Sequence, residues 1–465
     1  MTGPIPRVAG RRFLAGLALA AVVLPIGTTA PVAAATGWAD FGTPTATATF
    51  ATGVTFRQPV TIDRTLRRVE LLLGTAGSIG QSVILVPPPE GTGAITLSHA
   101  LDPAADGHIM PNTPLTARWR LVGADDPSDI EIGPEVRLTF DDDRFDWRTE
   151  AGELVRVHWY EGGESFGAEA LQIGEDAVRE VSELLQVTET DPVDFFVYAD
   201  QEAFYDALGP GTRENVGGQA NSDIRTMFAL ISPGEINDSW VRIVIPHELA
   251  HLVFDTAASN PYHFPPRWLN EGLAVYVSQG YDASDRGAVE RAAADGTLIP
   301  LDGLTGQFPT SFERFSLAYA ESVSAVDYLV RTYDQDALVS LIRSYADGRT
   351  DDEAFTAALG LDMTAFGDAW LADLGAAPPT RFGPKPAPAG PVPSAWTGEP
   401  GGSAPPAAAT SQPGASAGGT PDPGSGSPTS DLSTLAIMAV AVIVVVAVIV
   451  VVAIRRRRPG PGTAL

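Results

Sequence analysis

The sequence predicts a multi-domain protein: an N-terminal all-β, sandwich-like domain, an α+β domain, a disordered linker and a single C-terminal transmembrane helix. Three observations predict this order. Short β-favouring runs separated by turn residues continue to Tyr160, and amphipathic helical patterns dominate from Phe166 onward. A stretch rich in Pro, Gly, Ala and Ser then leads into an uncharged apolar segment, Leu432 to Ile454.

Residues 1–35 have the features of a secretory signal peptide. Arg7, Arg11 and Arg12 precede an uncharged run from Phe13 to Ile26, and three alanines, Ala33 to Ala35, supply an Ala-x-Ala cleavage site. The paired arginines hint at a twin-arginine signal, but the residue that usually separates them from the Phe is absent. General secretion is therefore expected.

Residues 36–160 are predicted to form the β-sandwich-like domain, because short strands recur there at regular spacing without long helical patterns. The predicted strands are Thr45 to Phe56, Arg68 to Leu73, Ser82 to Val86, Ala94 to Leu97, Leu115 to Leu121, Glu135 to Phe140 and Leu154 to Tyr160.

Residues 161–375 are predicted to form the α+β domain. Glu169 to Leu185 is amphipathic, Val193 to Tyr198 is a strand, and the chain is almost wholly helical after Pro246. The three aspartates Asp141 to Asp143, near the junction, lack the alternating ligand spacing of an EF-hand and are interpreted as a solvated turn.

The C-terminal part predicts attachment to a membrane. Residues 376–430 are a disordered linker by composition, and 432–454 are long enough to cross a hydrocarbon core of roughly 30 Å. The basic residues at the start of the 455–465 tail favour a cytoplasmic C-terminus. We therefore expect a single-pass cell-membrane protein with extracytoplasmic N-terminal domains.

The composition excludes some partners. The formal net charge of −27 includes seven arginines in the predicted leader and tail, so the exported part is near −27 − 7 = −34. Such a charge argues against binding to nucleic acid or anionic lipid. The chain has no cysteine, so its exported domains rely on their cores and not on disulfides. No sequence feature sets the oligomeric state.

The strongest chemical signal is His247-Glu-Leu-Ala-His251. On a helix, residues four apart share a face, so His247 and His251 can converge on one metal ion. Glu248 lies close enough to that face to take a proton from a metal-bound water. Apolar neighbours from Ile243 to Val253 predict a buried helix, in which the histidines and the carboxylate need partners.

A catalytic zinc needs a third protein ligand and an open position for water. Glu271 is the candidate, because Pro266 to Gly280 has apolar residues at helical spacing and can return beside the first helix. The loop from Asn260 to Pro266 contains three prolines and separates the two helices.

The two motifs together, His247-Glu-Leu-Ala-His251 and Trp268-Leu-Asn-Glu271-Gly-Leu-Ala, resemble those of the gluzincin metallopeptidases, and most of all the peptidase MA-like domain of bacterial surface proteins. The resemblance covers about Val193 to Leu374. It implies a thermolysin-like fold, Zn²⁺ held by His247, His251 and Glu271, Glu248 as catalytic base, and hydrolysis of peptide or protein substrates.

Other residues leave alternatives open. Tyr319, in the helical segment from Phe315 to Leu329, is a candidate to stabilise the oxyanion, as the resemblance suggests, or a core aromatic whose hydroxyl has a local partner. Asp255 can orient an imidazole or lie solvated at the helix end. His263 is expected to be a surface or packing residue.

Gluzincin aminopeptidases carry a Gly-x-Met-Glu-Asn segment whose carboxylate binds the substrate's amine. Gly217-Gly-Gln-Ala-Asn221 has no acid in the corresponding region, so an endopeptidase is favoured over an aminopeptidase. The segment can still be an edge strand that pairs with an extended peptide, or an ordinary turn. The alternative function is a cell-surface binding or adhesion protein that keeps a peptidase-like fold without turnover.

Overall fold

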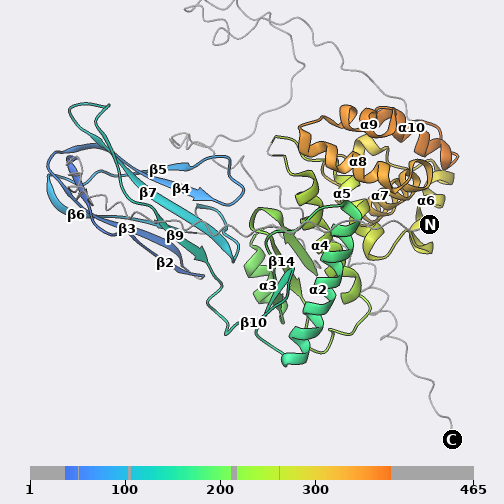
Figure 1. Ribbon diagram of the computed structural model, residues 1–465, viewed down its shortest axis with the longest axis horizontal. Helices are drawn as coiled ribbons and strands as arrows, with labels where there is room; N and C mark the ends of the chain where they lie inside the picture. Colours follow the sequence, from blue (N-terminus) through green and yellow to red (C-terminus); the bar gives the residue numbers. More distant parts are fainter. Residues whose placement is uncertain (1–36, 51, 103–105, 211–216, 261, 379–465) are drawn as a thin grey trace, which may run out of the picture.

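In the computed structural model, the described residues are 37–378, apart from 51, 103–105, 211–216 and 261. They form a β-sandwich followed by a mixed unit in which a sheet is flanked by helices (Figure 1). The expected signal peptide, the linker after residue 378, the transmembrane segment and the tail lie outside the described residues. Within the described part, no helix is both long and apolar enough to span a bilayer.

The sandwich consists of two antiparallel sheets. In the first, β3 pairs with β1, β2 and β6; in the second, the order is β5-β4-β7-β8, and β9 also pairs with β7. The strands are β1 (Ala39–Phe41), β2 (Thr45–Thr49), β3 (Gly53–Ile62), β4 (Leu66–Thr75), β5 (Ser82–Val86), β6 (Gly93–Leu101), β7 (Thr113–Gly123), β8 (Ile130–Ile132) and β9 (Val136–Phe140).

Alternating side chains of these strands fill the space between the two sheets. Phe56 on β3, Leu71 on β4 and Trp119 on β7 are fully buried in one cluster. The single strand expected over Thr45 to Phe56 is instead a hairpin, because Gly53 takes a positive φ of 84° and reverses the chain between β2 and β3.

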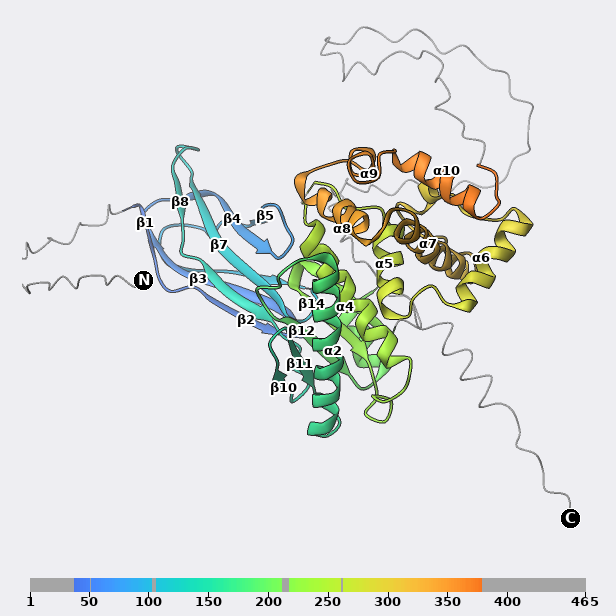
Figure 2. The same cartoon turned by 45° about the vertical axis from the view of Figure 1, so that its right-hand side comes forward.

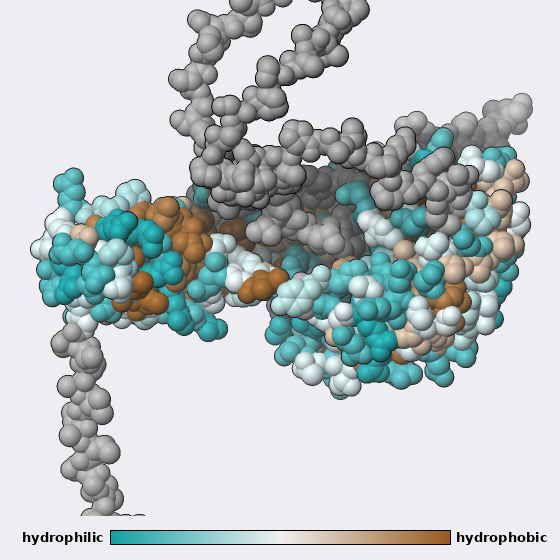
Figure 3. Space-filling model, turned by 90° about the horizontal axis from the view of Figure 1, so that it is seen from above, coloured by the Kyte–Doolittle hydropathy of each residue, from teal (hydrophilic) through white to brown (hydrophobic). Residues whose placement is uncertain are grey.

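Hydrophobic residues also gather on part of the sandwich surface (Figure 3). Among the exposed large apolar side chains of the described residues, Val83 and Leu85 lie on β5, and Ile130 and Ile132 lie on β8. Both strands are at edges of the same sheet. The exposed apolar side chains of this unit thus lie on edge strands, whereas the residues predicted to carry chemistry are in the second unit.

The second unit is built on a five-stranded sheet in the order β10-β11-β12-β14-β13. Its strands are β10 (Arg148–Ala151), β11 (Val155–Trp159), β12 (Val193–Tyr198), β13 (Gly218–Asn221) and β14 (Thr226–Leu230). The inner pairs β11/β12 and β12/β14 are parallel, and the outer pairs are antiparallel. The strand expected over Leu154 to Tyr160 thus belongs to this sheet, and the predicted boundary after residue 160 is wrong: it precedes Arg148.

The helices of this unit alternate with its strands as far as β14, and beyond β14 they follow one another, as predicted (Figure 2). They are α2 (Glu164–Leu185), α3 (Gln201–Leu208), α4 (Val241–Ala258), α5 (Arg267–Ser278), α6 (Ala283–Asp295), α7 (Phe312–Tyr333), α8 (Gln335–Ser344), α9 (Asp351–Leu359) and α10 (Met363–Asp373), with short 3₁₀ turns at Ser222–Ile224, Leu301–Leu304 and Tyr345–Asp347. The order confirms the α+β expectation, with the sheet before α4, the helix that contains His247 and His251, and further helices after it.

Both faces of the central strand β12 are buried. Val193, Phe195 and Val197 point into the core formed with α2 and α4, whereas Phe196 and Tyr198 point into a smaller cluster with α3. The sheet therefore presents one face to α4, the helix of the predicted metal motif.

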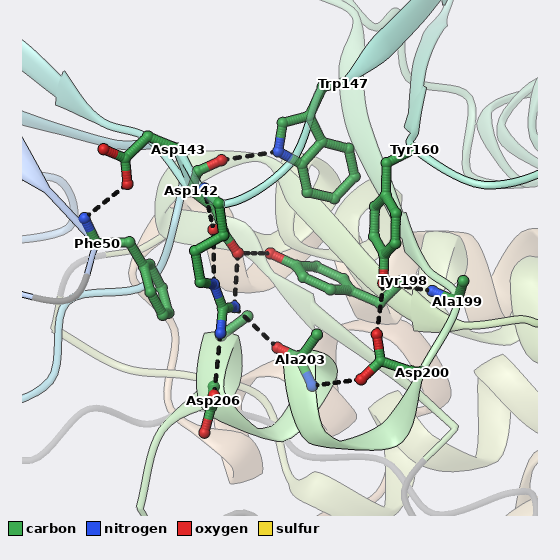
Figure 4. Close-up of polar contacts among 12 residues, drawn as sticks. Phe50, Asp142, Asp143, Trp147, Tyr160, Tyr198, Ala199, Asp200, Ala203 and Asp206 are labelled. Carbon is green, nitrogen blue, oxygen red and sulfur yellow. Dashed lines mark hydrogen bonds and ion pairs between the residues drawn. The ribbon is translucent and has the colours of Figure 1, made fainter.

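A partly buried ion pair in the segment that connects the two units contacts residues of both (Figure 4). Asp142, only 2% exposed, accepts hydrogen bonds from Arg144 (2.7 and 2.8 Å) and from the Tyr198 hydroxyl (2.9 Å). The Arg144 guanidinium also bonds Asp206 on α3 at 2.9 Å and lies over the Phe50 ring. The solvated turn expected at Asp141 to Asp143 is thus wrong for Asp142, because Arg144 and Tyr198 satisfy its charge in the interface.

Candidate metal centre

Two helices bring the predicted ligands together. His247 and His251 lie one turn apart on α4 with ring centroids 5.0 Å apart, and Glu271 comes from the first turns of α5. Among the described residues, these three form the one group of His, Cys, Asp or Glu whose possible ligand atoms all lie within 4.8 Å of one another. The structure thus brings together the residues that the two motifs predicted.

Helix α5 can pack closely against α7 because a glycine, Gly272, lies at their contact. A Cβ on Gly272 would lie 2.4 Å from the Ser322 carbonyl oxygen of α7. Trp268, one turn before Gly272 on the same face of α5, stacks on Phe366 of α10, with ring centroids 5.9 Å apart. These contacts fix the rotation of α5 and therefore the direction of the Glu271 side chain.

The ligand atoms are buried and lack protein hydrogen-bond partners. His247 and Glu271 are fully buried, and His251 is 3% exposed. Glu271 Oε2 lies 3.7 Å from His247 Nε2 and 3.6 Å from His251 Nε2, too far for hydrogen bonds, and all three atoms are orphaned. Two ligands about 2.0–2.1 Å from one tetrahedral zinc would be separated by about 3.3 Å. The donor set therefore fits a zinc ion.

The protonation states suit metal binding. Burial lowers the pKa of His247, and burial lowers the pKa of His251 to about 4, so both rings are neutral near pH 7. Burial alone would raise the pKa of Glu271, but its contacts with both histidines and Arg267 lower it below the ordinary value. Two neutral imidazoles and one carboxylate are the forms that coordinate zinc.

Asn270 orients one of the histidines. Its Oδ1 lies 2.8 Å from His251 Nδ1, so a proton on Nδ1 is donated to the amide and Nε2 keeps the lone pair that faces the site. The orienting partner is therefore Asn270 and not Asp255, whose pKa burial and nearby acids raise to about 6. Asn270 was not predicted from the sequence, although its position directly before the predicted ligand Glu271 was the available signal.

Glu248 points toward the edge strand of the sheet. Its Oε2 accepts a hydrogen bond from the Ala220 N–H of β13 at 3.1 Å, and its Oε1 is buried without a protein partner. Burial and the nearby Glu271 carboxylate raise the pKa of Glu248 well above its ordinary value. A carboxylate with a raised pKa is suited to accept and later release a proton. Gly218 is also required here, because a Cβ on it would lie 2.8 Å from Glu248 Cγ.

Tyr319 lies at the margin of the site. It is 8% exposed, and its ring centroid lies 6.4 Å from that of His247 and 5.3 Å from that of Phe308. It also hydrogen-bonds the side chain of Arg267. The structure thus contains features of both alternatives, a tyrosine beside the metal ligands and a tyrosine with a local partner, and its catalytic role stays a prediction.

Arg267 is a second residue of the site that was not predicted from the sequence. Its Nε and Nη2 each lie 3.0 Å from Glu271 Oε1. Burial would lower the pKa of Arg267, but the charges and hydrogen bonds of Glu271 and Tyr319 raise it above its ordinary value. His263 is not near this group: it bonds Asp351 at 3.0 Å and stacks on Tyr345, which agrees with the expected packing residue.

Comparisons with known proteins agree with the site. The Peptidase MA superfamily profile matches residues 173–376, which contain every residue of the candidate metal centre. This segment is a peptidase MA-like domain. The resemblance expected from the two motifs is confirmed, and with it a zinc metallopeptidase domain of the gluzincin type. No curated protein matches the chain at a significant level.

Solved structures with some similarity include the M1 zinc metallopeptidase of Deinococcus radiodurans (14% identity, 76% of this chain and 97% of that chain, TM-score 0.36). A mutant bound to a Tyr-Ser-Ala substrate, from the same organism, has 15% identity (74% and 95% covered, TM-score 0.35), and an aminopeptidase N family protein of Idiomarina loihiensis has 12% (70% and 75%, TM-score 0.34). At such TM-scores these similarities assign no residue a role.

One further buried carboxylate lies on α7, outside the metal group. Glu321 is fully buried and accepts hydrogen bonds from the Ile299 N–H at 3.0 and 3.2 Å. Burial raises its pKa from 4.5 to about 8. Glu321 is therefore protonated at neutral pH in the folded protein and ionised in the unfolded chain.

We expect Glu321→Gln to stabilise the domain increasingly as the pH rises from 5 to 8. In this window the unfolded chain has released a proton that the folded protein retains, so wild-type stability falls with pH, whereas Gln removes that dependence. The gain should be on the order of 4 kcal/mol at pH 8 and below about 1 kcal/mol at pH 5. Thermal unfolding at both pH values measures it, with the exposed Glu313→Gln on the same helix as control; equal gains at both pH values would contradict the assignment.

Proposed function

We propose that the protein is a membrane-anchored, extracytoplasmic zinc metallopeptidase that hydrolyses peptide bonds. The observation that carries the hydrolytic function is the convergence of His247, His251 and Glu271 with the unbonded Oε1 of Glu248 beside them. A binding module without turnover needs no free buried carboxylate next to a metal group. The peptidase MA-like domain supports the same substrate class.

Zinc bound by His247, His251 and Glu271 would act as a Lewis acid and lower the pKa of a water ligand to about 7. Glu248 would take the proton of the attacking water on Oε1 and pass it to the leaving amine. The Ala220 N–H holds its other oxygen, so the carboxylate keeps one orientation during both transfers. Tyr319 would donate a hydrogen bond to the developing oxyanion.

The strand β13 supports an extended peptide as substrate. It is the last strand of its sheet, and no strand of the described residues lies beyond it. It also contains Ala220, whose backbone contacts Glu248. A peptide paired with this edge would therefore lie along the base, with its backbone held by main-chain hydrogen bonds.

The mode of cleavage depends on where a free amine can bind. The endopeptidase expected from the sequence rested on the absence of an acid in Gly217 to Asn221. Gly211-Thr-Arg-Glu214-Asn215, directly upstream and outside the described residues, has a glutamate and an asparagine in the order of the aminopeptidase motif. Glu214 is therefore a candidate to bind a substrate amine. This observation makes aminopeptidase activity the second candidate mode, beside the endopeptidase expected from the sequence.

Replacing Glu248 by Gln should abolish turnover while zinc stays bound. We expect kcat on an unstructured protein substrate to fall by roughly 10²- to 10⁴-fold, the usual contribution of a general base. Chelation of the wild type should remove activity, and added Zn²⁺ should restore it. Glu290→Gln on α6 is the matched exposed control. Identical products from wild type, Glu248→Gln and chelated samples would contradict the enzymatic function.

Blocking the substrate's amine should distinguish the two modes. For an aminopeptidase, a peptide with a free N-terminus is cleaved and its acetylated form is not. Glu214→Gln should then lower kcat/KM roughly 10- to 100-fold, the loss of a hydrogen bond to a charged group. The exposed Glu202→Gln serves as control. Cleavage of both peptides at the same internal bond, unaffected by Glu214→Gln, would instead support an endopeptidase.

Anchoring should depend on the apolar segment from Leu432 to Ile454, which the basic residues Arg455 to Arg458 follow. Deleting residues 432–465 should move the protein from the membrane fraction into the soluble extracytoplasmic fraction with its activity intact. A full-length chain that is found in the soluble cytosolic fraction would contradict both export and anchoring.

A further inference from the structure

One guanidinium lies between a metal ligand and the predicted oxyanion stabiliser. Arg267, the first residue of α5, precedes Glu271 by four residues, so the two side chains share a helix face. Arg267 binds Glu271 Oε1 through two nitrogens, each at 3.0 Å, while Glu271 Oε2 faces the two histidines at 3.6 and 3.7 Å. The guanidinium and the histidine pair therefore contact opposite oxygens of one carboxylate.

The same guanidinium holds Tyr319. It hydrogen-bonds the Tyr319 side chain and lies 4.7 Å from the centroid of the Phe308 ring. Phe308 in turn packs edge-on against Tyr319, with centroids 5.3 Å apart. Arg267 is 20% exposed, so aromatic rings and the site itself enclose most of its side chain.

Helix stability does not explain an arginine at this position. A cation in the first turn of a helix interacts unfavourably with the helix dipole, and an Arg placed N-terminal to a Glu four residues on is the weaker orientation of such a pair. Burying a charged pair also has a desolvation cost that its attraction barely offsets. Another effect must therefore explain Arg267 at this position. Its contacts with Glu271 and Tyr319 indicate that it fixes the geometry of the site.

We propose that Arg267 is a positioning residue that fixes the metal ligand Glu271 and the Tyr319 hydroxyl with one guanidinium. By occupying Oε1, it leaves Glu271 a single oxygen to offer to a metal ion. By bonding Tyr319, it sets the distance between the phenol and that ion. The planar guanidinium can hold both partners at once, which the single ammonium of lysine does less well. This proposal rests on the proposed function.

Zinc affinity is the first test. Arg267→Gln should bind zinc roughly 10- to 100-fold more weakly than wild type in competition with a chelating indicator, the usual effect of losing a partner that orients a ligand. Arg267→Lys should fall between the two. Arg331→Gln is the matched control, because Arg331 also pairs with a carboxylate four residues away and lies over a tyrosine ring, but on α7 away from the site. Its zinc affinity should be unchanged.

The link to Tyr319 is tested with a double-mutant cycle at saturating zinc. Tyr319→Phe and Arg267→Gln should each lower kcat with little change in KM, and the double variant should lose less than the product of the two single losses. Such coupling is not expected from a residue that only supports the fold. Losses that multiply would overturn the link to Tyr319.

Wild-type zinc affinity in Arg267→Gln would overturn the proposal. Thermal unfolding of the metal-free variants checks the fold, and if Arg267→Gln does not fold, Arg267→Lys takes its place in both measurements. Failure of the proposed function is distinguishable, because in that case the wild type itself would neither bind zinc nor cleave peptides.

Discussion

The burial of one carboxylate sets the conditions for the whole candidate site. The Glu271 side chain is fully buried, and its negative charge would be strongly unfavourable there without a partner. Two histidines on one side, a guanidinium on the other and a place for a divalent cation together make its charge tolerable. Each of these partners needs a defined position. Helix α4 must present both histidines on one face, α5 must begin with Arg267, and α7 must bring Tyr319 within reach of Arg267.

The rest of the domain provides these positions. The sheet and α2 form the core against which α4 packs, and the edge strand β13 brings a backbone N–H to Glu248. Gly218 and Gly272 allow two close approaches, one of the edge strand to Glu248 and one of α5 to α7. Two glycines therefore allow the close packing that positions the residues of the candidate site.

Much of this was predictable from the sequence, because the evidence was local. The spacing of His247 and His251, the apolar periodicity around Glu271 and the strand Val193 to Tyr198 each depend on neighbouring residues, and the structure agrees with them. What depends on distant partners was missed. Asp142 looked like part of a solvated turn, because Tyr198 lies 56 residues away. β11 looked like a sandwich strand, since a strand alone does not reveal which sheet it joins. Asn270 and Arg267 acquire their roles only once their neighbours are seen.

The ion pair between Asp142 and Arg144 has a consequence for how the two units can move against each other. Because Asp142 and Arg144 lie two residues apart, opening the joint would leave this pair intact but would break its bonds to the Tyr198 hydroxyl and to Asp206. These two contacts should therefore couple the sandwich to the peptidase MA-like domain and restrict the rotation of one unit against the other. The orientation of the candidate metal centre is thereby tied to that of the sandwich.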